Sequence, residues 1–278
     1  MNNNTKARIM RWAVYAGAAF TVFVLASIVG YILIKGIPNL SLDLFAWEYN
    51  TSNVSLMPAL INTILMTLIS LIVAVPLGIG AAIYLTEYAR RGNRLVKLVR
   101  LTAETLSGIP SIIYGLFGSL FFVVALKMGL SLISGALTLS IMVLPLIMRT
   151  TEEALLAVPD SYREGSFGLG AGRLRTTFKV VLPSAAPGIL SGVILAIGRI
   201  VGETAALIYT AGTIPEVAHS LLDSTRTLSV HMYVISSEGL YINQSYATAV
   251  VLLVIVIAIN ALSSRVANRI GRSNYGKA

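Results

Sequence analysis

The chain has 278 residues, of which 56% are hydrophobic and 12% are charged, and its mean hydropathy is +0.80. This composition excludes an ordinary soluble domain and indicates a polytopic membrane protein. The chain has no cysteine and only two histidines, which lie far apart; this excludes a disulfide framework and a zinc motif, and we expect no cofactor.

Six hydrophobic segments follow one another along the chain and predict six transmembrane helices. They span approximately residues 12–34, 58–85, 109–126, 130–148, 185–211 and 246–262. The first is about twice as long as the apolar region of a signal peptide and has no clear cleavage site, so we expect a retained helix. Pro76, Gly78 and Gly80 predict a kink or a close helix contact in the second. The segments 35–57 and 212–245 are more polar, which favours external loops.

Between the second and third segments, residues 87–104 predict an amphipathic helix along the inner membrane surface. Its basic residues are Arg90, Arg91, Arg94, Lys97 and Arg100. Pro110 suits the first turn of the third span. Lys127 and Gly129 indicate a short break before the fourth.

Basic residues are distributed unevenly between the segments that join the spans. With both termini inside, seventeen lie in inner segments and three, Lys35, Lys127 and Arg226, lie in outer ones. Because positive residues concentrate on the cytoplasmic side, the distribution predicts that both termini are cytoplasmic. The net charge of +9 then reflects contact with membrane lipid, and no nucleic-acid partner is expected.

The segment 162–183 is polar although apolar segments flank it, and we interpret it as a structured cytoplasmic loop. Ser161 and Glu164 have the spacing of a capping box at the start of a short helix. The glycines that can adopt the positive φ needed to end this helix are Gly168, Gly170 and Gly172.

A second amphipathic turn follows in the same segment. Leu174, Phe178 and Leu182 lie on one side of it, and Pro183 is expected to end it. The whole segment is therefore predicted to form a knob of two short helices at the membrane surface.

This segment resembles the EAA loop of bacterial ABC importer permeases. The residues that carry the resemblance are Glu164, Gly165, Ser166, Gly170, Val180, Leu182 and Pro183. Gly165 and Ser166 stand where that family usually has two alanines, and all of these residues are small. The resemblance implies a coupling helix that docks in a groove of an ATP-hydrolysing subunit. A structured loop without a partner is the alternative.

A charged pair interrupts the fifth hydrophobic segment. Arg199 and Glu203 are four residues apart, which places them on one face of a continuous helix. A buried arginine requires a partner, a cavity or the bundle interior. Its guanidinium can bind an oxyanion while the carboxylate orients it, or the pair can simply join helices. Gly198 and Gly202 indicate a side on which a second helix packs tightly.

Four further motifs restrict the resemblance to one group of these permeases. They cover residues 82–88, 108–115, 149–154 and 199–205. With the loop, and over about residues 58–265, they resemble the PstA-type permeases of bacterial phosphate ABC importers. The resemblance implies an all-α, type I ABC importer permease fold with six transmembrane helices in the bacterial inner membrane. It also implies that Arg199 and Glu203 line the phosphate path.

The partners implied by the resemblance are a PstC-type sister permease, a PstB-type ATPase dimer and a PstS-type phosphate-binding protein. It divides the chain into an N-terminal helix with an external loop (1–57), a permease domain (58–265) and a cytoplasmic tail (266–278).

Three weaker patterns have alternative interpretations. The glycines of 168–172 superficially resemble a nucleotide loop, but no strand precedes them and no Gly-Lys-Ser/Thr element exists, which argues against a nucleotide site. The charged residues Arg149, Glu152 and Glu153 can line a cytoplasmic exit or end a helix in water, and we favour the latter. The outer residues His219, Asp223, Arg226 and His231 can dock a binding protein or be ordinary solvated positions.

The function favoured by these patterns is that of a permease subunit, not an enzyme, in an ATP-driven phosphate importer. A permease for another oxyanion and a secondary transporter are the alternatives, although a secondary transporter predicts internal repeats that the sequence lacks. An intramembrane enzyme needs a nucleophile, base or metal constellation, and Arg199 with Glu203 does not provide one.

Overall fold

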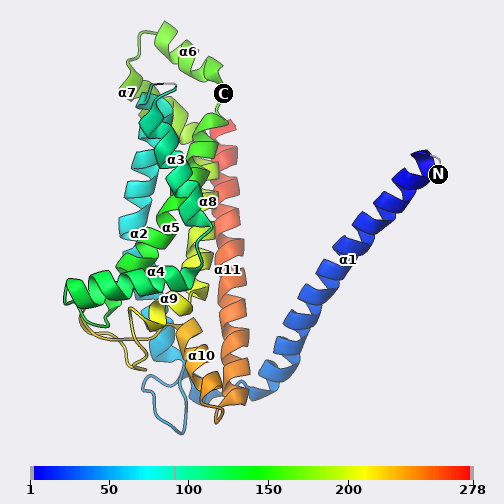
Figure 1. The fold of residues 1–278 in the computed structure, drawn as a ribbon, viewed down its shortest axis with the longest axis vertical. Helices are drawn as coiled ribbons and strands as arrows, with labels where there is room; N and C mark the ends of the chain where they lie inside the picture. The colour runs from blue at the N-terminus through cyan, green and yellow to red at the C-terminus, as the bar shows by residue number, and fades with distance from the viewer. Residues whose placement is uncertain (1–2, 91, 276–278) are drawn as a thin grey trace.

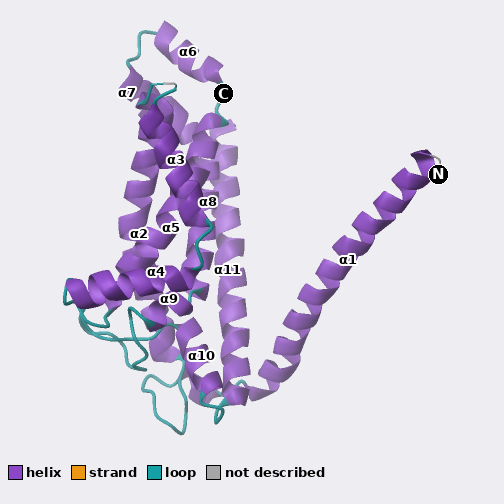
Figure 2. Ribbon diagram, viewed as in Figure 1, coloured by secondary structure: helices purple, strands orange, loops and turns teal. Residues whose placement is uncertain are grey.

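The computed structural model describes residues 3–90 and 92–275, and within these residues every regular element is helical (Figures 1 and 2). The longer helices are α1 (Asn3–Gly36), α2 (Met57–Ile83), α3 (Arg94–Ser107), α5 (Leu132–Leu156), α8 (Leu182–Gly202) and α11 (Ile242–Tyr275). The shorter ones are α4 (Ser111–Gly118), α6 (Asp160–Gly168), α7 (Arg173–Thr176), α9 (Ala205–Ile208) and α10 (Leu228–Ser237). Short 3₁₀ or π turns complete the chain: η1 (Ile37–Asn39), η2 (Leu42–Phe45), η3 (Tyr84–Tyr88), η4 (Ser119–Ala125) and η5 (Thr177–Val181).

The core of the bundle is the packing of α2 and α8 on α5. Ser70 Oγ donates to the carbonyl of Ala136 at 3.1 Å, and Ser140 Oγ donates to the carbonyl of Ser70 at 3.1 Å. A Cβ on Gly78 would lie 2.9 Å from Ile147 Cγ2, so the absence of a side chain lets α2 and α5 approach closely. Small residues and interhelical hydrogen bonds are the usual means of joining helices in a membrane. The close contact predicted at Gly78 is confirmed.

Among the described residues, five helices are long and apolar enough to cross a membrane, or up to six if the bent pair α3–α4 counts as one span. The axis bends by 103° between the α3 segment and the α4–η4 segment. In Figure 1, α3 runs along the bundle and α4 lies across it.

This bend corrects two predictions. The predicted third span, residues 109–126, is helical but lies across the bundle instead of along it, and α3 does not lie along the inner surface but packs lengthwise on α5. Pro110 is the reason: the α conformation is disfavoured at the residue before a proline, and Pro110 itself has ψ 139, so the helix ends before it and a new one begins at Ser111.

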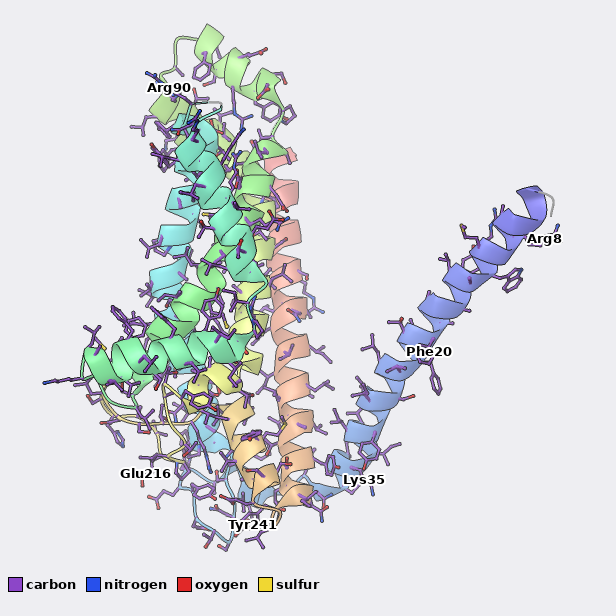
Figure 3. All side chains as sticks on the ribbon, in the orientation of Figure 1. Arg8, Phe20, Lys35, Arg90, Glu216 and Tyr241 are labelled. Atoms are coloured by element: carbon purple, nitrogen blue, oxygen red, sulfur yellow. The ribbon has the colours of Figure 1, made fainter. Side chains whose placement is uncertain are left out.

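Helix α1 stands apart from the bundle along most of its length (Figures 1 and 3). It contacts α11 near its own C-terminal end, where Tyr31 and Tyr246 share a hydrogen bond of 3.4 Å between their hydroxyl oxygens. Apolar side chains such as Phe20, which is 68% exposed, face outward. The predicted helix is present, its retention stays a prediction, and its apolar surface is free for lipid or another subunit to cover.

The two ends of the bundle differ in structure. The α6 end carries α6 and α7, and both the start of α1 and the end of α11 point toward it (Figure 1). The α10 end carries α9, α10 and the longer loops, as the positions of Glu216 and Tyr241 in Figure 3 show. The segment 212–245, expected to be a loop, contains α10, which packs against α11 and α2. The expected tail 266–278 continues α11 as far as Tyr275, and residues 276–278 lie outside the described part of the chain.

Candidate functional site

Arg199 lies in the last turn of α8, where its side chain is partly buried. Among the residues that the structure describes, none forms a hydrogen bond or ion pair with its guanidinium. Tyr114 on α4 is close enough to interact with it electrostatically. A guanidinium without a carboxylate partner keeps its full positive charge, so this position attracts anions.

Glu203 does not lie on the same helix as Arg199, which corrects the predicted pairing. Helix α8 ends at Gly202, and Glu203 is extended with φ −73° and ψ 130°. Its side chain is buried and Oε1 accepts a hydrogen bond from the Ala206 amide at 3.1 Å. Its carbonyl accepts from Ser229 Oγ of α10 at 2.5 Å. Glu203 therefore caps α9 and stabilises the break between α8 and α9.

Gly198 and Gly202 flank Arg199 on a surface that this chain leaves open. Apart from its chain neighbours and the backbone of α8 itself, no atom of the described residues lies within 4 Å of a Cβ built at either glycine. The tight helix contact expected there is not made within the chain. An unpaired arginine beside a helix break and an open small-residue surface can form one half of an anion path that a second subunit completes.

The α6 end forms the predicted knob of two short helices. Helix α6 covers Glu164, Gly165 and Ser166, and Ser166 Oγ lies 2.9 Å from Thr176 Oγ1 of α7. Gly170 joins the two helices with φ +82°, a conformation that favours glycine. The glycine-ended helix is confirmed for Gly170.

Three details of the knob differ from the sequence prediction. The N-cap of α6 is Pro159 and no side chain caps it, so the capping box of Ser161 and Glu164 is not formed. Gly168 and Gly172 do not adopt positive φ. Pro183 does not end the second turn but lies in the first turn of α8, where a proline needs no amide hydrogen. Val180 and Leu182 lie in η5 and the start of α8, so the knob continues directly into the bundle.

A buried ion pair, which the sequence analysis missed, fixes the knob to the bundle. Arg163 Nη2 lies 2.8 Å from Glu87 Oε1, and the two side chains are 15% and 8% exposed. Arg163 also donates to the carbonyls of Leu155 and Val158 at the end of α5, at 2.9 and 2.8 Å. Because the partners are 76 residues apart, no local pattern could predict the pair.

The knob exposes several large apolar side chains among its charged ones. Its exposed large side chains are Tyr162, Phe167, Leu169, Leu174 and Phe178. Leu169 is 91% exposed, so nearly all of this large apolar side chain is uncovered. Contiguous exposed apolar side chains mark a site of protein contact.

A second charged cluster lies where α3 meets α5, toward the α6 end. Arg100 Nη2 lies 2.5 Å from Glu152 Oε1, and Arg149 Nε lies 3.2 Å from Glu153 Oε1. Glu152 has a side chain only 11% exposed, so the interpretation of these residues as a helix end in water fails for Glu152. Arg149 and Glu153 are more than half exposed, so for these two residues the interpretation as a helix end in water holds. All four residues line a cavity of about 290 Å³.

The described residues contain no group of three or more histidine, aspartate or glutamate side chains arranged to hold a metal ion.

The sequence matches the model of a protein family, the inner membrane component of binding-protein-dependent transport systems, over residues 74–273. The chain belongs to this family. It is 34% identical to the probable ABC transporter permease protein YqgI of Bacillus subtilis (strain 168) over 238 residues, 80% of this chain and 81% of the relative. It is 37% identical to the phosphate transport system permease protein PstA of Pasteurella multocida over 208 residues, 74% of each chain. The PstA protein of Haemophilus influenzae is 31% identical over 260 residues, 92% of each chain.

Solved structures of ABC transporters have the same fold. A chain of the bacterial transporter for the acidic polysaccharide alginate superposes with a TM-score of 0.64 at 17% identity, covering 95% of this chain and 99% of that chain. A chain of the inward-facing MetNI methionine transporter gives a TM-score of 0.58 at 20% identity, covering 86% and 96%. The predicted ABC importer permease fold is confirmed.

Proposed function

We propose that the chain is the permease subunit of an ATP-driven phosphate importer and forms half of its translocation path. The observation that carries the proposal is the unneutralised guanidinium of Arg199 at a helix break inside the bundle of a transport permease. Phosphate as the cargo is supported by the PstA relatives.

Arg199 acts as the anion contact in this proposal. A planar guanidinium donates several hydrogen bonds to a tetrahedral oxyanion and stays charged at every physiological pH. Glu203 has a positioning role, because its side chain caps α9 and so stabilises the break between α8 and α9. This break lets the C-terminal end of α8 face the path.

The knob at the α6 end couples this path to a separate ATPase. Its proposed coupling residues are Glu164, Gly165, Ser166, Gly170, Val180, Leu182 and Pro183. The exposed apolar surface around Leu169 suits a groove on another protein, and the Arg163–Glu87 pair transmits a push on α6 to the end of α2. The partners are then a PstB-type ATPase dimer, a PstC-type sister permease and a PstS-type binding protein.

The chain is a multi-pass protein of the bacterial inner membrane. Both ends of the described chain point toward the α6 end, which supports cytoplasmic termini (Figure 1). Residues 58–265 form the permease domain in this proposal, preceded by α1 and its external loop. Labelling of a cysteine added at the C-terminus by an impermeant reagent from outside would contradict the topology.

Reconstitution of the four components in liposomes tests the function. We expect phosphate uptake that requires both hydrolysable ATP and the binding protein, and that excess unlabelled phosphate abolishes while sulfate does not. Uptake driven by a proton or sodium gradient without ATP would indicate a secondary transporter. ATP-driven uptake of a different oxyanion in preference to phosphate would keep the permease assignment and overturn the cargo.

A further inference from the structure

A buried arginine that forms no ion pair with the described residues lies at the α10 end of the molecule. Arg226 is 3% exposed, and neither Nε nor Nη2 makes a hydrogen bond of normal geometry with any described residue. None of the ion pairs in the described part of the chain includes it. Burial lowers the pKa of Arg226 from its ordinary value, and the Tyr49 hydroxyl and the charge of Glu238 offset only part of this effect.

The backbone that presents Arg226 is firmly held. Asn62 Nδ2 donates to the carbonyl of Arg226 at 3.3 Å, and the Leu228 amide donates to Thr63 Oγ1 at 2.8 Å. On the other side, the Thr225 amide donates to the carbonyl of Ala211 at 3.0 Å. Arg226 is therefore attached to α2 and to the end of α9, and its position is preorganised.

The covering group is Tyr49, which lies in a loop without helix or strand, residues 46–55, here called the cover loop. The guanidinium carbon of Arg226 lies 4.8 Å from the centre of the Tyr49 ring. The same ring meets His231 edge to face, with ring centres 6.1 Å apart. Another contact of the cover loop with the rest of the chain is the hydrogen bond from Tyr241 Oη to the carbonyl of Thr51, 3.0 Å long.

The cover loop also contains a strained residue. Val54 has φ +46°, in the left-handed region that β-branched residues avoid, and is 1% exposed. His231 beneath the loop is fully buried and uncharged, because burial and the nearby Arg226 lower its pKa to about 3. Both the strain and the unpaired guanidinium donors raise the free energy of the closed loop, while the stacking of Tyr49 lowers it.

We propose that Arg226 is a second anion-binding residue, at the outer end of the permease, and that the cover loop opens to let phosphate reach it. A rigidly held guanidinium with free donors matches a tetrahedral oxyanion. The hydrogen bonds of Asn50 and Asn53 keep the shape of the cover loop, and Ser55 Oγ anchors its base to the carbonyl of Leu44, so the loop opens by breaking the Tyr49 stack and the Tyr241–Thr51 hydrogen bond. This inference rests on the proposed function, since it places an entry site for the same cargo before Arg199.

The absence of native cysteine permits a direct test of opening. Thr227→Cys introduces a thiol beside Arg226 at a position that is 1% exposed. In the assembled complex, we expect an impermeant maleimide to label it at least tenfold faster with Tyr49→Ala than with Tyr49→Phe, which keeps the aromatic stack. Ser237→Cys on the exposed end of α10 is the accessible control. Equal rates for the two Tyr49 variants would overturn the role of Tyr49 as a cover.

Anion binding is tested in the open Tyr49→Ala background with inorganic phosphate as the probe. We expect phosphate to slow labelling of Thr227→Cys at least threefold, and Arg226→Gln to remove this protection. If phosphate does not slow labelling, or slows it equally with Arg226→Gln, Arg226 is not an anion site.

Uptake separates this inference from the proposed function. If the unmodified complex takes up no phosphate, the proposed function fails. If it does, we expect Arg226→Gln to lower uptake at least tenfold while ATPase activity stimulated by the loaded binding protein stays within twofold. Arg226→Lys, which keeps the charge, should retain at least a third of the uptake. Unchanged uptake with Arg226→Gln, or a parallel loss of uptake and ATPase activity, would show that Arg226 only holds the fold.

Discussion

Arg163 of the knob and Glu87 at the end of the second membrane helix form an ion pair of 2.8 Å that is almost entirely buried. Arg163 belongs to α6, which otherwise has few contacts with the bundle, and Glu87 belongs to η3, which continues α2. A displacement of α6 by an ATPase must therefore act on α2 through this pair. In the coupling proposal, the Arg163–Glu87 pair is the contact that connects movement of α6 with movement of α2.

Glu87→Gln should weaken that link. Loss of the charge removes a charge-assisted hydrogen bond, which contributes about 2 kcal/mol when buried. We expect ATP-driven phosphate uptake to fall at least fivefold while the complex still assembles and hydrolyses ATP. The matched control is Glu153→Gln, because Glu153 is 65% exposed in its pair with Arg149 and should be nearly silent. Equal effects of the two variants on uptake would contradict the link.

Gly170→Ala should damage the knob, whereas Gly172→Ala should not. Gly170 has φ +82°, which costs an alanine about 1 kcal/mol, whereas Gly172 has φ −74°. Neither position has an atom within 4 Å of an added Cβ, so the comparison isolates backbone strain. Coupling is measured as phosphate transported per ATP hydrolysed, and we expect a decrease for Gly170→Ala alone. If both variants behaved like the unmodified chain, the geometry at Gly170 would not matter for coupling.

The α10 end of the permease should lose stability in acid because of His231. Its pKa in the folded state is about 3, below the ordinary value near 6.5, so the unfolded chain takes up a proton first as pH falls. Stability contributed by the neutral ring is complete above about pH 6.5 and decreases below it, by up to about 1.4 kcal/mol per pH unit. The positive charge of Arg226 disfavours protonation of His231 in the folded state.

Thermal unfolding at pH 7.5 and pH 5.0 measures this effect. The unmodified chain should lose about 2 kcal/mol more than His231→Gln over this interval. His219→Gln removes the other histidine, which is exposed, and should lose as much as the unmodified chain. A fall in stability that is the same in all three would contradict the burial of a neutral His231.

The sequence predicted the elements that depend on local patterns and missed those that depend on distant partners. The knob was predictable because its glycine and polar residues lie within one short segment. The break at Glu203 was not, since the spacing from Arg199 assumes an unbroken helix, and the break is held by Ser229, 26 residues further along the chain. The third span was misplaced because hydropathy averages do not register how Pro110 redirects the chain.

The central claim is that Arg199 contacts the transported anion. Comparison of Arg199 with Glu203 tests this claim. In the described part of the chain no ion pair joins the two residues, so the proposal gives each its own role: Arg199 contacts the anion and Glu203 caps α9. Arg199→Gln should therefore abolish phosphate uptake in an assembled complex. Glu203→Gln should lower uptake only a few-fold, since its amide oxygen can still accept from Ala206.

The double variant Arg199→Gln with Glu203→Gln gives the most direct measurement. ATP-driven phosphate uptake is measured in liposomes for the unmodified complex, both single variants and the double variant. The account predicts that the double variant is as inactive as Arg199→Gln, because the missing group is the anion contact. If the double variant instead transported phosphate, the two residues would be a neutralising pair that joins helices, and the anion path would not run along Arg199.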